Sequence, residues 1–147
     1  MQKYEGVVTH IQHQKNNQSP LFPKDWDLTE FKKLTALLPF SDEAIEYLSA
    51  LSSIINKDIR VKQYPDVATF AFFCRRASIL QLKEQYHNDD KLRLGRGVVF
   101  HITPSNVPIN FAFSLISGIL SGNSNIVRVP SKRFEQIDIV SDAIISL

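Results

Sequence analysis

The pattern of apolar positions changes character near Gly95, and this change divides the chain. Before it, apolar residues recur at intervals of three and four, which is the spacing of amphipathic helices. After it, two short runs rich in β-branched residues, 97–103 and 125–130, alternate with two helix-length segments. Strand, helix, strand and helix in this order predict a parallel βαβ unit with a right-handed crossover. We therefore expect an α/β fold.

Three helices with apolar stripes are expected between residues 25 and 90. The first starts with a capping-box-like pair, Asp27 and Glu30. The second follows Ser41, and the third begins at Pro65 and ends before the polar stretch HNDD. In chain order the stripes are Leu28, Phe31, Leu34 and Leu38; Ile45, Leu48, Leu51 and Ile55; and Val67, Phe70, Ala71, Cys74 and Ala77.

The segment after Gly95 has clear boundaries between its elements. The nearly continuous apolar run 97–103 is typical of a strand that is covered on both faces. A helix of about 14 residues fits between Pro108, in its first turn, and Gly122, at its end. The strand 125–130 follows, and Ser131 or a neighbour is expected to cap the last helix. The apolar side of that helix carries Ile137, Val140 and Ile144.

Composition narrows the function classes. The chain has 147 residues, 22% of them charged, and a formal net charge of +2, which suits one globular domain. Lys and Arg are mixed with Asp and Glu, so no nucleic-acid partner is expected. The sequence has no signal-peptide pattern and no apolar run of the roughly 18 residues that a membrane span needs, so a cytoplasmic protein is expected. The single cysteine, Cys74, excludes an internal disulfide.

Residues 1–24 form an arm or an edge of the predicted fold. A short strand is expected near residues 5–12, followed by a loop in which Asn, Gln, Ser and Pro break any period. His10 and His13 lie there without partner ligands, so no metal site is expected.

The loop between the first strand and helix of the βαβ unit is the candidate site. In open α/β sheets ligands bind beyond the carboxyl ends of the strands, and the stretch TPSNVP (103–108) lies at such an end. The side-chain amide of Asn106 has two hydrogen-bond donors, and prolines restrict the backbone on either side of it. In an alternative interpretation, Asn106 caps the helix that follows.

The stretches GVVFHITPSNVP and SLISGILSGNSNIVRVPSK resemble the LuxC-like acyl-CoA reductase branch of the aldehyde dehydrogenase superfamily. The likeness is clear over residues 95–133 and loose over 41–94, and none is seen for 1–40. It implies that 95–147 begin a Rossmann-like dinucleotide-binding sheet of the aldehyde dehydrogenase type. It also implies that 41–94 are the helical part of the cofactor domain and that 1–40 are an N-terminal arm with a strand and a helix.

The resemblance implies an activity. A cysteine thiolate attacks an acyl-CoA or a related acyl thioester, and hydride then reduces the bound acyl group to an aldehyde. Asn106 would donate to the oxyanion. The expected cofactor-binding residues are Thr103, Pro104, Ser105, Arg128 and Ser131. A basic residue at the end of the second strand suits a 2′-phosphate, so Arg128, with Lys132 and Arg133 nearby, favours NADPH. Alternatively, Arg128 ends the strand in solvent.

The nucleophilic cysteine of that branch lies beyond the segment that carries the motif. Cys74 precedes the motif on the apolar stripe of a predicted helix, where a thiol is expected to be inert. The chain stops within a predicted helix after only two strands of the expected sheet. We therefore expect an incomplete N-terminal part that is inactive alone. Its exposed apolar strands would favour a homo-oligomer or association with the missing part.

Two other functions remain open at this point. In the first alternative, the chain is part of an aldehyde dehydrogenase that oxidises free aldehydes. Such enzymes usually have an aromatic residue at the position of Ser105, so the loop disfavours this alternative. In the second alternative, the chain is a non-catalytic remnant that binds nucleotides or other proteins.

Overall fold

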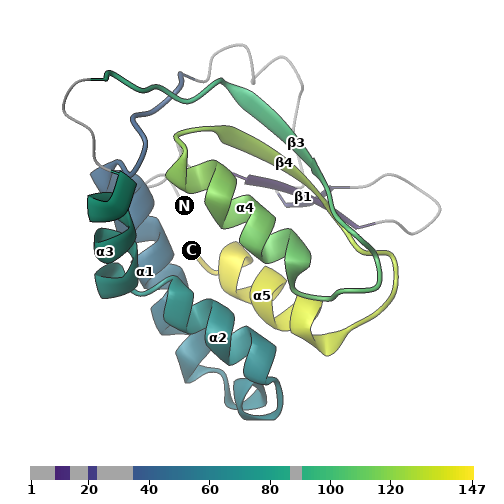
Figure 1. Ribbon diagram of the computed structural model, residues 1–147. Helices are drawn as coiled ribbons and strands as arrows, with labels where there is room; N and C mark the ends of the chain where they lie inside the picture. Colours follow the sequence, from purple (N-terminus) through teal and green to yellow (C-terminus); the bar gives the residue numbers. More distant parts are fainter. Residues whose placement is uncertain (1–8, 14–19, 23–34, 87–90) are drawn as a thin grey trace.

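The computed structural model describes residues 9–13, 20–22, 35–86 and 91–147, with side chains from residue 35 onward. Ten elements follow one another within these ranges (Figure 1). They are β1 (Thr9–His13), β2 (Pro20–Phe22), α1 (Asp42–Lys57), the 3-10 helix η3 (Ile59–Gln63), α2 (Pro65–Phe73), α3 (Arg76–Tyr86), β3 (Val98–Ile102), α4 (Asn110–Leu120), β4 (Ser124–Val129) and α5 (Glu135–Ile145).

The sheet has four strands in the order β2-β1-β4-β3. β1, β4 and β3 are parallel, and β2 is antiparallel to β1. The structure thus confirms an α/β fold and the parallel pairing of β3 and β4. β1 confirms the strand expected near residues 5–12, but it lies inside the sheet and not at its edge, because it pairs with β4 over five residues.

The helices α4 and α5 lie on one side of the sheet, with α1, α2 and α3 packed beyond them (Figure 1). One apolar core joins all five of these helices to β4. None of the helices in the described ranges is long and apolar enough to cross a membrane.

α1 confirms the second predicted helix. Ser41 caps it, because the Ser41 hydroxyl accepts a hydrogen bond from the Ala44 N–H at 3.3 Å. The four positions of the predicted stripe are fully buried, since their apolar spacing keeps them on one face. They are Ile45, Leu48, Leu51 and Ile55.

The third predicted helix is two helices. α2 ends at Phe73, and the N–H of Arg75 donates to the carbonyl of Phe72, a tighter bond than the α-helical pattern. The chain then changes direction into α3, which resets the helical phase. Ala77, predicted on the apolar stripe, is therefore exposed, and Ile79 is buried instead.

The first predicted helix lies outside the described residues except for its last positions. Those positions, 35–38, are not helical. Leu37 is held in an extended segment by backbone hydrogen bonds, donating to Gly122 and accepting from Gly95. Leu38 is 54% exposed, so its place on an apolar stripe was wrong.

Two helix starts differ from the prediction. α4 begins at Asn110 with 11 residues, because Pro108 lies in a separate turn before it. Gly122 follows the end of α4 with φ +77°, as the terminator role requires. α5 begins at Glu135 after Phe134, which provides no side-chain cap, so Ser131 does not cap this helix.

Candidate active site

The predicted site residues lie at the end of the sheet where the parallel strands β3 and β4 have their carboxyl ends. β3 and β4 pair in parallel with Ile102 opposite Arg128, so the carboxyl ends of both strands lie at the same end of the sheet. The loop that contains Thr103 and Asn106 leaves β3 there, and Ser131 follows β4 at the same end. The fold therefore brings together the two segments that carry the predicted residues.

Asn106 does not cap α4. The N-cap position is Ile109, and no side chain bonds to the first turn of the helix. The Asn106 side chain is exposed and forms no hydrogen bond with the described residues. Its amide donors are thus accessible to a ligand, and the capping alternative is excluded.

Thr103 is the inward-facing member of the loop. Its Oγ1 atom is buried and has no hydrogen-bond partner among the described residues. A buried hydroxyl without a partner costs roughly 1–3 kcal/mol and needs an explanation, and a bound ligand is one. The next two residues, Pro104 and Ser105, are exposed.

The open face of β3 carries apolar side chains. Val98, Phe100 and Ile102 are 46%, 54% and 70% exposed, so described residues cover only one face of the strand, in contrast to the prediction. Arg128 points to the same open side, because it pairs with Ile102 across the strands and is itself exposed. Ser131, Lys132 and Arg133 are exposed after it.

The covered face of the same strands holds a polar cluster that the sequence analysis missed. Here the ring of His101 on β3 contacts Ser114 on α4 and Asn125 on β4, at 2.7 and 2.9 Å. Asn125 follows two other polar residues, Asn123 and Ser124, whereas His101 and Ser114 are each an isolated polar position within an apolar run. That feature is the signal that would have revealed the cluster, once the strand register was known.

Most of the chain matches a known protein family. Residues 18–139 match the acyl-CoA reductase (LuxC) family. The chain belongs to this family. The match confirms the resemblance seen over residues 95–133 and also covers 18–40, for which the sequence analysis claimed no likeness. No curated protein and no solved structure matches the chain significantly.

Cys74 is unsuited to be the nucleophile of this LuxC-family chain. It lies at the end of α2 and is fully buried in the apolar core. Burial raises the pKa of the Cys74 thiol to about 12, so almost no thiolate forms at neutral pH. The structure thereby confirms that this cysteine occupies an inert, apolar position.

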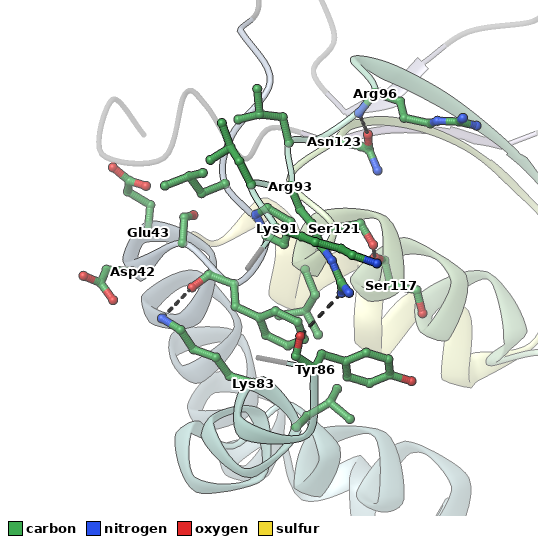
Figure 2. Close-up of a pocket in the computed structure, with 18 of the residues that line it drawn as sticks. Asp42, Glu43, Lys83, Tyr86, Lys91, Arg93, Arg96, Ser117, Ser121 and Asn123 are labelled. Atoms are coloured by element: carbon green, nitrogen blue, oxygen red, sulfur yellow. Dashed lines mark hydrogen bonds between the residues drawn. The ribbon is translucent and has the colours of Figure 1, made fainter. Parts of the chain in front are cut away.

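A hollow of about 1280 Å³ lies at the opposite end of the α/β unit (Figure 2). Its lining includes Ser117 and Ser121 of α4 and the segment 91–96, but none of the predicted site residues. Two cations that line it bond to backbone carbonyls: Lys83 to Phe40 at 3.1 Å and Arg93 to Tyr86 at 3.4 Å. This hollow is separate from the loop at the carboxyl ends of the strands.

No three His, Cys, Asp or Glu side chains in the described ranges are grouped to hold a metal ion.

Proposed function

We propose that this chain forms the cofactor-binding part of an enzyme that reduces an acyl thioester to an aldehyde with NADPH. The match to the acyl-CoA reductase family over residues 18–139 carries the proposal. The position of the Asn106 loop, at the carboxyl ends of two parallel strands, supports it. The proposal includes a Rossmann-like sheet of the aldehyde dehydrogenase type, to which β3, α4, β4 and α5 contribute one βαβ unit and the helix after it.

Asn106 is the proposed oxyanion donor. Its amide would donate a hydrogen bond to the thioester oxygen, which becomes negatively charged as the carbonyl carbon becomes tetrahedral. One such donor contributes roughly 2.7–4 kcal/mol to lowering the barrier. The exposed side chain, with its donors unused by the described residues, suits this role.

The covalent step needs a thiolate that another segment supplies, because Cys74 is sealed in the core. That thiolate would attack the acyl-CoA carbonyl, the bond to the CoA sulfur would break, and CoA would leave as its thiolate. Bound NADPH would supply the hydride that converts the enzyme thioester to an aldehyde and frees the cysteine. Residues 1–147 by themselves should not reduce acyl-CoA.

The preference for NADPH rests on charge. Arg128 is exposed at the end of β4, and the exposed cations Lys132 and Arg133 follow it. The 2′-phosphate distinguishes NADPH from NADH, and a guanidinium can bind two of its oxygens at once. The orphaned hydroxyl of Thr103, at the end of the neighbouring strand, is the further polar group that fits a bound cofactor.

The test compares Arg128→Glu with Arg76→Glu in the acyl-CoA reductase polypeptide that contains residues 1–147. Both changes place the same charge at an exposed position, but Arg76 lies on α3, away from the sheet edge. The Kd for NADPH should rise far more than the Kd for NADH in Arg128→Glu, and neither should change in Arg76→Glu. Equal losses for the two nucleotides in Arg128→Glu would refute the assignment of NADPH.

A further inference from the structure

Three polar side chains connect β3 and α4, which flank the Asn106 loop, with β4. His101 is 9% exposed and Asn125 is fully buried. The Nδ1 atom of His101 lies 2.7 Å from the Ser114 hydroxyl, and its Nε2 atom lies 2.9 Å from Asn125 Oδ1. A polar cluster in such a place is costly unless its hydrogen bonds are all made.

The hydrogen bonds define the state of the imidazole. The Asn125 amide nitrogen donates to the Asn123 carbonyl at 2.7 Å, which turns Oδ1 toward the ring. Because Oδ1 can only accept, Nε2 must carry the proton. In the neutral ring Nδ1 then accepts from the Ser114 hydroxyl. The Nε2–H tautomer thus satisfies all three side chains without another partner.

α4 approaches this cluster closely. A Cβ atom at Gly118 would lie 1.9 Å from Asn125 Oδ1 and 3.0 Å from His101 Nε2. Only glycine allows the helix to pack at this depth, so the position of α4 against both strands is tightly defined.

The cluster also joins the two elements on either side of the Asn106 loop. The hydrogen bond between His101 and Ser114 joins positions 13 residues apart, and Asn106 lies between them. Because His101 lies in β3 and Ser114 in α4, this bond fixes the two elements that flank the loop relative to each other. Asn125 adds the second strand to the same connection, so three elements are held in one geometry.

We propose that His101, Ser114 and Asn125 are positioning residues that hold the Asn106 amide where the oxyanion forms. This inference rests on the proposed role of Asn106 as oxyanion donor. A displacement of about 1 Å in a catalytic group can cost roughly 100-fold in rate, so the effect of the cluster is on kcat.

A catalytic Ser-His-Asn relay is the competing interpretation, and the geometry disfavours it. Ser114 contacts Nδ1 and the amide contacts Nε2, which reverses the usual arrangement, and an amide lacks the charge that stabilises an imidazolium. The hollow beside α4 is lined by Ser117 and not by Ser114. The Ser114 hydroxyl instead points into the interface between helix and strand.

Kinetics on the reductase polypeptide that contains residues 1–147 test the inference. Ser114→Ala removes the donor to Nδ1, and His101→Gln keeps a donor toward Asn125 but lacks the ring nitrogen that accepts from Ser114. Ser117→Ala is the matched control, because Ser117 lies on the same helix and, among the described residues, its hydroxyl donates only to the Phe113 carbonyl. In both test variants kcat should fall about 10-fold to 100-fold with KM for acyl-CoA little changed. The control should match the wild type.

Nitrogen NMR of the His101 ring tests the geometry in the unmodified protein. The Nε2–H tautomer is expected, and Ser114→Ala should shift the Nδ1 signal. An Nδ1–H tautomer would overturn the inference. So would an unchanged kcat in a folded Ser114→Ala protein, if the separate variant Asn106→Ala has a lowered kcat. An unchanged kcat in Asn106→Ala would instead refute the oxyanion proposal itself.

Discussion

The helical cluster α1 to α3 and the βαβ unit from β3 to α5 bury different kinds of groups. Among the described residues, the helical cluster buries one polar side chain, Ser52, whose hydroxyl donates to the Ala71 carbonyl at 2.6 Å. The βαβ unit buries four, and the unpartnered hydroxyl of Thr103 adds to them. The four are His101, Ser124, Asn125 and Ser141. Burying a polar group without a hydrogen bond costs stability, and the two unpartnered buried hydroxyls among the described residues, those of Thr103 and Ser141, both lie in the βαβ unit.

The two regions meet along a seam of backbone contacts. The segment before α1 donates from Leu37 to Gly122 and from Phe40 to Leu120, and Gly95 donates back to Leu37. This seam lies at the end of α4 away from Asn106. The difference between the regions therefore makes a general prediction: changes in the βαβ loop should affect catalysis, and changes in the cluster and the seam should affect stability.

The largest expected effect is that of Asn106→Ala on catalysis. The side chain forms no bond with the described residues, so the free energy of unfolding should stay within about 0.5 kcal/mol of the wild type. Loss of the oxyanion donor should lower kcat about 100-fold to 1000-fold. Steady-state kinetics and urea unfolding on the reductase polypeptide measure the two quantities. Asn110→Ala, an exposed asparagine at the start of α4, is the control.

Asn106→Ala could instead lower the free energy of unfolding enough to explain the fall in activity. That result would contradict the expected contrast between the βαβ loop, which should affect catalysis, and the helical cluster, which should affect stability. It would show that the loop stabilises the fold, as the cluster does.

Local sequence signals predicted most of the helices and strands. They could not predict where the helical spacing is interrupted, or which distant segments pack against each element. The Ser41 cap and the apolar stripe of α1 act within a few residues, so the sequence shows them. Ala77 continues the spacing of α2 across the break, and no local pattern reveals that the chain has turned. The parallel pairing of β1 with β4 joins distant segments and was equally invisible.

The position of the Asn106 loop could be predicted, but its surroundings could not. The place of the Asn106 loop follows from the order strand, helix, strand, which puts it at a carboxyl edge. The contact of His101 with Asn125 was not predictable, because it depends on the register of β3 against β4. The contact with Ser114 depends in addition on how α4 is rotated above the sheet.

The second effect in size is the loss of stability in Gly122→Ala at the seam. Gly122 has φ +77°, and an added Cβ would lie 2.1 Å from the Leu37 carbonyl oxygen. The backbone strain and this clash together should lower the free energy of unfolding by about 2–3 kcal/mol. Gly97→Ala is the matched control, since Gly97 has φ +104° but nothing within 4 Å of its added Cβ. It should lose only about 1–2 kcal/mol.

Urea unfolding of both glycine variants measures the difference, and kcat per folded molecule should be unchanged in each. If both variants lose the same free energy of unfolding, the backbone near Leu37 moves away from the added Cβ at little cost, and the seam is not rigid.

The smallest effect concerns Cys74 and appears only at alkaline pH. Burial raises the pKa of its thiol to about 12, whereas an unfolded chain has a cysteine pKa near 8.5. The unfolded state therefore releases the thiol proton first. The stability that this thiol contributes is fully present below about pH 8.5 and is lost as the pH rises toward 12. Urea unfolding between about pH 8 and pH 10 should show a steeper loss for the wild type than for Cys74→Ala, which has no proton to release at this site. If the free energy of unfolding falls equally with pH in the wild type and in Cys74→Ala, the thiol has an ordinary pKa in the folded protein. The helical cluster would then not be the chemically inert region that its apolar packing indicates.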